Sequence, residues 1–243
     1  MQISPGAAGT ADGARRSRAP ARRPTLARAP GACRICGDAT AFGYGLCLSC
    51  RAVALALGRP LVPVTAIRVV GPESGLYRAL RQYKSGEPSV AHRQEQRLTA
   101  ILDAFCRRHL PALAPGGLDL SVVVPSARAQ RPPPHPLARV VASAAHLPPH
   151  RDVLGAGPGM ADHRQPALDA YQADPCVAGK RVLVVDDVYT SGAHLQSAAA
   201  TLHDAGAASV VALVIGRYDR GARSERSGAG RRRRWPAAPQ GSG

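Results

Sequence analysis

The chain has 243 residues, 45% hydrophobic and 20% charged, enough for one substantial core and a small accessory unit. Its net charge of +16 is uneven, because residues 1–30 hold six Arg and one Asp, and residues 217–243 hold eight Arg and two acidic residues. The Arg, Ala, Pro, Gly and Ser mixture at both ends predicts disordered basic tails over 1–30 and 218–243. No apolar run suits a membrane span or a signal peptide. The sequence therefore predicts a cytoplasmic protein, with an organellar transit peptide as the alternative.

The basic tails have two interpretations. They are solvated ends of the chain, or they bind nucleic acid such as single-stranded DNA by releasing counterions from its phosphates. Only 4% of the residues are aromatic, which argues against recognition by base stacking. The charge alone does not choose between solvated ends and a nucleic-acid partner.

Four cysteines near the N-terminus have the spacing of a metal site. Cys33 and Cys36 form one CxxC pair, and Cys47 and Cys50 form a second pair after a short glycine-containing loop. This pattern is typical of a tetrahedral four-thiolate zinc site. A closed shell of four thiolates leaves no open coordination position, so we expect structural zinc in a unit over residues 31–55. A redox CxxC pair and unmetallated thiols are the alternatives, and disulfides are less expected because nothing indicates secretion.

Strand and helix patterns alternate over residues 60–217. Short apolar runs predict strands, and apolar residues at helical spacing predict helices. Their alternation predicts an α/β fold with a parallel sheet flanked by helices, and ligands bound beyond the carboxyl ends of the strands. In chain order we expect a strand at 66–70, helices at 76–83 and 93–110, a strand at 118–124, a helix at 136–147, and strands at 152–154, 182–185 and 210–215.

Residues 182–194 hold the strongest functional pattern. The apolar run at 182–185 predicts a buried strand, and the acidic pair Asp186-Asp187 and the small-residue turn Thr190-Ser191-Gly192 follow it. Apolar residues at helical spacing then predict a helix that ends near Gly206. The N–H groups at a helix N-terminus bind phosphate, and small residues let the backbone approach it. The carboxylates repel phosphate, so they suit neighbouring ribose hydroxyls or a Mg²⁺ ion bridging hydroxyls and a diphosphate.

This segment resembles the thirteen-residue phosphoribosyl pyrophosphate (PRPP) motif of type I phosphoribosyltransferases. The resemblance implies that Asp186 and Asp187 are the catalytic acidic pair, which binds the ribose hydroxyls. It also implies that the following turn holds the 5′-phosphate, through Val188, Tyr189, Thr190, Ser191, Gly192 and Ala193. His194 departs from the family pattern, which usually has Thr or Ser at this position. The departure affects a side-chain hydroxyl contact to the phosphate, whereas the contacts from backbone N–H groups of the turn are unchanged.

Two other segments resemble parts of the same superfamily. The strand-to-turn segment at 122–128 resembles the pyrophosphate loop, with Ser126, Ala127 and Arg128 at the matching positions. A plain surface arginine is the alternative interpretation of Arg128. Segment 155–175 takes the place of the mobile loop that covers the substrate. Arg164 in this segment and Lys84 are further candidates to neutralise the leaving diphosphate.

Residues 80–86 read Leu-Arg-Gln-Tyr-Lys-Ser-Gly and resemble a Leu-x-x-Tyr-Lys-x-Gly segment of the competence protein ComF group. In that group a four-cysteine zinc unit precedes a phosphoribosyltransferase domain, the order found here over residues 33–217. The resemblance implies a transferase domain at 60–217 that binds PRPP with Mg²⁺. Diphosphate would leave as an unidentified nitrogenous acceptor attacks, with catalysis resting on positioning and charge neutralisation more than on a covalent nucleophile.

A function of a different class stays open. Resemblance to the ComF group also implies a link to DNA uptake, in which the chain is a non-catalytic accessory factor that binds nucleotide or single-stranded DNA. A fold that carries a PRPP motif does not establish turnover. A homodimer is likewise an open alternative to a monomer.

Overall fold

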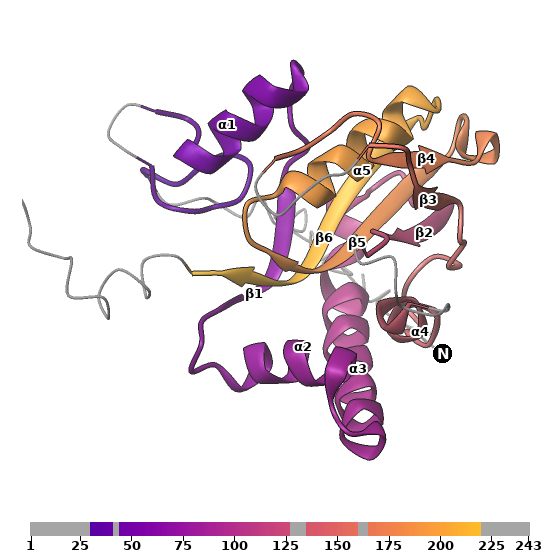
Figure 1. Ribbon diagram of the computed structural model, residues 1–243. Coiled ribbons are helices and arrows are strands. Elements are labelled where there is room, and N and C mark those ends of the chain that lie inside the picture. The colour runs from indigo at the N-terminus through magenta and orange to yellow at the C-terminus, as the bar shows by residue number, and fades with distance from the viewer. Residues whose placement is uncertain (1–29, 41–43, 127–134, 160–164, 220–243) are drawn as a thin grey trace, which may run out of the picture.

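The computed structural model describes residues 30–40, 44–126, 135–159 and 165–219. Its centre is a four-stranded parallel sheet in the order β1-β6-β5-β2. The strands are β1 (Val64–Val70), β2 (Leu120–Val123), β5 (Arg181–Tyr189) and β6 (Ser209–Tyr218). Helices cover both faces of the sheet (Figure 1). The α/β fold with a helix-flanked parallel sheet is therefore confirmed, while the expected basic tails lie almost wholly outside the described residues.

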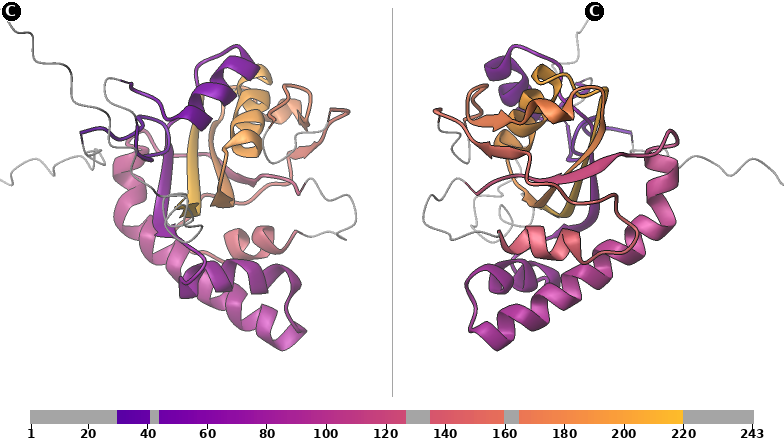
Figure 2. Two further views of the ribbon diagram at one scale, coloured as in Figure 1. Left: turned by 60° about the vertical axis from the view of Figure 1, so that its left-hand side comes forward. Right: turned by 90° about the vertical axis from the view of Figure 1, so that its right-hand side faces the viewer.

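One face of the sheet packs against α5 (Ala193–Asp204) and the N-terminal cysteine segment with its helix α1 (Leu48–Leu57). Figure 2 shows α1 and α5 together on this side, away from the other helices. Val182 and Val184 of β5 join the four cysteines and Leu195 of α5 in one buried cluster. The cysteine segment thus shares its apolar core with the sheet.

The opposite face packs against α2 (Gly75–Ser85), α3 (Pro88–Leu113) and α4 (Pro136–Ala142). Leu183 and Val185 of β5 point into this second core, so successive residues of the strand alternate between the two sides. Burial on both faces explains the continuous apolar run of this strand. None of the helices in the described ranges is long and apolar enough to cross a membrane.

Side chains at the helix N-termini fix where α2, α3 and α4 begin. The Ser74 hydroxyl accepts from the Tyr77 N–H at 3.4 Å and starts α2. The Glu87 carboxylate accepts from the Ser89 and Val90 N–H groups, and Pro88 occupies the first turn of α3. His135 caps α4 in the same way, ahead of Pro136. These starts set the direction of α2 and α4, both of which reach the carboxyl ends of the strands.

Strand β5 is longer than the sequence predicts. The apolar run predicts a strand that ends at Val185, and the aspartates that follow have low strand propensity. The structure continues β5 through Asp186, Asp187 and Val188 to Tyr189, since β6 offers a parallel partner along this whole length. Pairing across the sheet therefore overrides local propensity, and the acidic pair lies within the strand and not in a turn after it.

A second small sheet replaces one expected strand of the main sheet. β3 (Leu154–Ala156) pairs antiparallel with β4 (Tyr171–Ala173), so the strand expected at 152–154 is shifted and lies outside the parallel sheet. The chain runs beside β2 only at a bridge between His150 and Ser121 and then turns away. Helix α4 also ends five residues early, at Ala142. The sequence patterns did not predict α1, β4 or the short 3-10 helix at Pro175–Val177.

Gly216 of β6 lets α2 lie close to the sheet. A side chain there would press on Val70 and on Leu80 of α2, whose nearest atoms lie 2.9 and 3.0 Å from an ideal Cβ position. We expect Gly216→Val to lower the free energy of unfolding by about 1–3 kcal/mol, measured by urea denaturation, because a close-packed core does not absorb extra carbon atoms. Gly155→Val is the matched control, since no atom lies within 4 Å of its Cβ position. Equal effects of the two changes would contradict the packing argument.

Candidate functional site

A cavity of about 340 Å³ opens at the carboxyl ends of β2 and β5. The helices that follow these neighbouring strands, α4 and α5, pack on opposite faces of the sheet, which creates the crevice where open parallel sheets bind ligands. Its volume is within the range of small-molecule sites. The lining comes from α2, from the ends of β2 and β5 and from the starts of α4 and α5: Tyr77, Leu80, Arg81, Lys84, Ser85, Val124, Pro125, Ser126, His135, Asp186, Asp187, Val188, Thr190 and His194.

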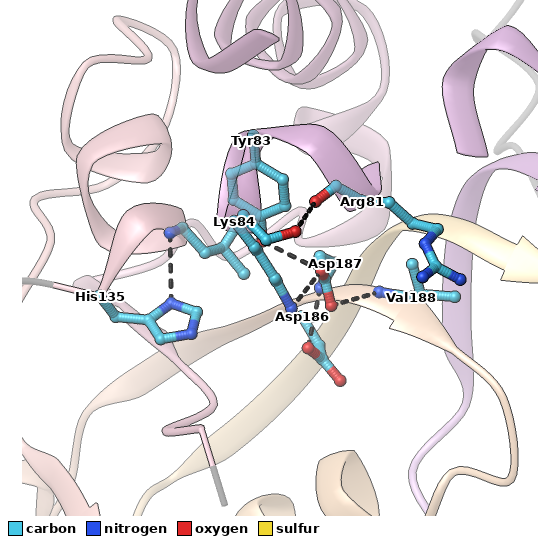
Figure 3. A network of polar contacts seen from close by, with 9 residues as sticks. Arg81, Tyr83, Lys84, His135, Asp186, Asp187 and Val188 are labelled. Atoms are coloured by element: carbon cyan, nitrogen blue, oxygen red, sulfur yellow. Dashed lines mark hydrogen bonds and ion pairs between the residues drawn. The ribbon is translucent and has the colours of Figure 1, made fainter. Parts of the chain in front are cut away.

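The acidic pair is held by polar contacts from α2 and from its own backbone (Figure 3). Lys84 Nζ lies 2.5 Å from Asp187 Oδ2, and the Tyr83 hydroxyl donates to the same oxygen at 3.0 Å. The other oxygen of Asp187 accepts from the Val188 N–H at 2.8 Å, and Asp186 accepts from the Asp187 N–H at 2.8 Å. Because Asp187 is only 6% exposed, these contacts replace most of its hydration.

The two carboxyl groups differ in their readiness to ionise. Burial, and then repulsion from Asp187, raises the pKa of Asp186 to about 7. Burial also opposes ionisation of Asp187, but the Lys84 ammonium and the Tyr83 hydroxyl outweigh it and lower the pKa of Asp187. Near neutral pH the pair therefore carries one firm negative charge and one proton that is easily lost, so together the carboxyls both accept and donate hydrogen bonds to sugar hydroxyls.

The small-residue turn lies at the same end of the sheet. Thr190 lines the cavity, and the Ser191 hydroxyl accepts from the Ala193 N–H at 3.2 Å, where α5 begins. Gly192 caps this helix with φ +90°, a conformation that favours glycine. The positive end of the α5 dipole thus meets the cavity that holds the carboxylates on its other side.

The structure separates the sequence-predicted site residues into three groups. Lys84, Ser126, Asp186, Asp187, Val188 and Thr190 line one cavity. Tyr189, Ser191, Gly192 and Ala193 build the turn without lining that cavity. Ala127, Arg128 and Arg164 lie outside the described residues.

Tyr189 is directed away from the cavity. Its side chain is 2% exposed, and its hydroxyl oxygen lies 3.4 Å from Cys50 Sγ on the face covered by α5. A phosphate contact of the Tyr189 side chain has no support in this geometry, while its backbone still leads into the turn.

Sequence reasoning missed several residues of the cavity wall, of which Tyr77, Arg81, Ser85 and His135 are polar. Tyr77, Arg81 and Lys84 have helical spacing on α2 and therefore share one face, a signal that was available in the sequence. His135 had no comparable signal, because it lies directly before the start of α4, where it accepts from the Leu137 N–H at 3.2 Å. His194, the departure from the family pattern, also lines the cavity, with Nδ1 3.0 Å from the Tyr171 hydroxyl.

The four cysteines form a second site on the other side of the turn. The sulfur atoms of Cys33, Cys36, Cys47 and Cys50 all lie within 4.8 Å of one another, and those of Cys36 and Cys47 are 3.6 Å apart. Tetrahedral coordination with bonds of about 2.3 Å separates sulfur atoms by about 3.8 Å. All four residues are buried. The cluster therefore has the spacing and the donor type to hold one metal ion.

The raised pKa of Asp186 predicts a gain in stability from Asp186→Asn. An acid with a raised folded-state pKa binds more protons in the folded chain, so the wild type loses stability as pH rises from about 4 to about 7. We expect the variant to be more stable than the wild type by roughly 1–3 kcal/mol at pH 8 in magnesium-free buffer, and nearly equal at pH 4. Urea denaturation at both pH values measures this difference.

Asp169→Asn is the control for that experiment, because Asp169 is exposed. A pH-independent effect of Asp186→Asn, or an equal gain from Asp169→Asn, would show that charge repulsion in the acidic pair is not its cause.

Comparison with known proteins shows little similarity to this chain. No protein-family model matches the sequence, and no curated protein matches it. Among solved structures, one titled as the structure of the allosteric regulatory enzyme of purine biosynthesis is 22% identical over 42% of this chain. The chain covers only 23% of that enzyme, with a TM-score of 0.30. This likeness is too partial to carry an argument about function, which therefore rests on the geometry of the two sites.

Proposed function

We propose that the chain binds PRPP with Mg²⁺ and transfers its phosphoribosyl group to a nitrogenous acceptor, with release of diphosphate. One observation carries the proposal: a single cavity gathers the acidic pair, the Lys84 ammonium and the Thr190 turn at the start of α5. Carboxylates suit ribose hydroxyls, and a helix N-terminus suits a phosphate about one sugar away. The arrangement therefore matches the two ends of a ribose 5-phosphate.

The acidic pair would orient the ribose. Asp187 is already fixed by Tyr83, Lys84 and the Val188 N–H, so its position costs little further ordering when ligand binds. Asp186, with its easily lost proton, would adjust to donate or accept at the second hydroxyl. The oxygen-rich end of β5 also fits Mg²⁺ chemistry, and Mg²⁺ bound with the diphosphate would stabilise negative charge on the leaving group.

Cations from α2 would assist the departure of diphosphate. Lys84 is 27% exposed on its side chain, and it reaches the cavity together with Arg81. As negative charge develops on the leaving oxygen, an ammonium beside it lowers the barrier, because the site is partly shielded from water. Lys84 would then exchange part of its contact with Asp187 for one with the diphosphate.

We further propose that the four-cysteine cluster holds a structural Zn²⁺ in a unit over 31–55, ahead of a transferase domain at 60–217. The sulfur spacing, the full burial and the set of four thiol donors support zinc over harder cations. With four thiolates bound, no coordination position remains for a substrate. Zinc at this site would stabilise the fold and take no part in the transfer.

Isothermal titration calorimetry with PRPP and Mg²⁺ tests the transferase proposal. We expect micromolar to submillimolar binding by the wild type, and a loss of at least about tenfold in Asp186→Asn plus Asp187→Asn, since the variant loses the firm charge of Asp187 and the adjustable carboxyl of Asp186. Asp204→Asn, an exposed change at the end of α5 opposite to the cavity, should bind as the wild type does. Absence of PRPP binding by the wild type would refute the proposal, and binding without diphosphate release across a panel of bases would favour a non-catalytic accessory role.

Metal analysis and thermal unfolding test the zinc proposal. We expect one zinc per chain, lost in Cys36→Ser but kept in Cys176→Ser, whose thiol is exposed and outside the cluster. Removal of zinc by a chelator should lower the melting temperature by about 10 °C or more, because a site of this kind contributes several kcal/mol to folding. Equal zinc content in the two variants would contradict the assignment.

A further inference from the structure

Tyr189 links the two sites physically. It is the last residue of β5, and its buried hydroxyl lies 3.4 Å from Cys50 Sγ, although the two residues are 139 positions apart in the chain. From Tyr189 the backbone passes directly into Thr190, which lines the cavity. One side chain therefore contacts the metal-binding cluster while its backbone begins the candidate phosphate turn.

The ring of Tyr189 also shapes that turn directly. Gly192 has φ +90°, and a Cβ atom at this position would overlap the hydroxyl and ring carbons of Tyr189. The ring thus occupies the space against which the turn closes before α5 begins. A shift of the ring moves the surface on which Gly192 rests, and with it the N-terminus of α5.

We propose that Tyr189 is a positioning residue that couples zinc occupancy of the four-cysteine cluster to phosphate binding at the Thr190–Gly192 turn. The inference rests on the proposed function, because it requires that this turn binds the 5′-phosphate of a ribose 5-phosphate ligand. It adds that affinity for the phosphate depends on the metal, through one hydrogen bond and one ring contact.

The chemistry of Cys50 explains how the metal acts on Tyr189. A thiolate bound to a metal has no proton, so the hydrogen bond must run from the Tyr189 hydroxyl to the sulfur. Hydrogen bonds to charged acceptors are roughly twice as strong as neutral ones, and partners of this kind orient the ligands of metal sites. Without metal, no coordination bond holds Cys50 Sγ in place, so the position of the atom that the Tyr189 hydroxyl contacts is not fixed.

Two sets of polar contacts between α5 and the segment before β1 do not involve the cysteines. The Gln196 side chain accepts from the Val62 N–H at 3.0 Å and donates to the Val62 carbonyl at 2.9 Å, and Arg59 pairs with Asp204 at 2.8 Å. These contacts hold the segment before β1 against α5 whether or not metal is bound. The contact of Tyr189 is different because its partner atom is the sulfur of a candidate metal ligand, Cys50.

Calorimetry with ribose 5-phosphate as the probe tests the coupling in zinc-loaded and zinc-stripped protein. Coupling between sites typically changes affinity by about 5–150-fold, so we expect zinc removal to weaken binding about tenfold in the wild type. Tyr189→Phe keeps the ring beside Gly192 and removes the hydroxyl, and we expect less than about a threefold effect of zinc in this variant. An equal zinc effect in both proteins would overturn the role of Tyr189.

Gln196→Met is the matched control. It removes both hydrogen bonds to Val62 from the same helix without touching the cysteines. We expect lower thermal stability but an undiminished zinc effect on ribose 5-phosphate binding. Loss of the zinc effect in Gln196→Met would mean that general docking of the N-terminal segment, and not the Tyr189 hydroxyl, carries the coupling.

Coupling between two binding sites is reciprocal, so the ligand should change zinc affinity if Tyr189 couples the sites. A tyrosine with a merely structural role would not produce this change. Saturating ribose 5-phosphate should raise zinc affinity, measured by competition with a chelator, by the same factor that zinc raises ligand affinity. We expect this gain in the wild type and its loss in Tyr189→Phe. A gain in zinc affinity that persists in Tyr189→Phe would refute the proposal.

Hydrogen exchange without any ligand separates this inference from the proposed function. Zinc removal should speed amide exchange across residues 190–194 in the wild type, and Tyr189→Phe should exchange fast with zinc present. That result in a protein that binds neither PRPP nor ribose 5-phosphate would refute the proposed function and leave only the structural link from the cysteine cluster to the turn, without an effect on phosphate binding. Binding with zinc-independent exchange and affinity would keep the function and refute the coupling.

Discussion

Two adjacent carboxyl groups at the end of a buried strand impose the constraint on which this end of the molecule depends. Parallel pairing with β6 carries Asp186 and Asp187 into the strand, where Asp187 is only 6% exposed and Asp186 is partly buried. A buried charge of this kind needs a partner, and α2 supplies it through Lys84 and Tyr83. The position of α2 over the sheet is therefore an electrostatic requirement of β5 as much as a result of apolar packing. Gly216 makes the close approach of this helix sterically feasible.

Under the proposed function the same strand end would also bind an anion, which the carboxylates alone would repel. In the structure, the Asp187 carboxylate and the turn that follows it face different sides of the sheet. Asp187 points toward α2 and its cation, whereas the turn through Thr190 leads to the N-terminus of α5 on the other face of the sheet. Proton retention by Asp186 further reduces the negative charge beside the turn. A ligand with hydroxyls at one end and a phosphate at the other satisfies both halves, and a simple anion satisfies only one.

The sequence predicted the parts of the fold in which local pattern and burial agree. Val182 to Val185 is apolar throughout because both faces are covered, and the α2 and α3 patterns repeat at helical spacing. It failed where partners distant in sequence decide the structure. β6 extends β5 past its aspartates, and the ribbon of β3 and β4 forms by a pairing that no local signal encodes. The contact of Tyr189 with Cys50 was not predicted for the same reason, since only the folded chain brings these two residues together.

The four-cysteine segment and the sheet depend on each other. So short a segment cannot build a sufficient core of its own, and its cysteines are buried in the same cluster as Val184 and Leu195. The sheet face in turn relies on this segment and α5 for its cover. Removing a metal from the cysteines would consequently loosen the apolar cluster and the turn that Tyr189 supports, and not only the N-terminal loops. If zinc fills the cluster as proposed, it would influence binding at the cavity without touching the ligand, because the strand that ends at Tyr189 contacts both sites.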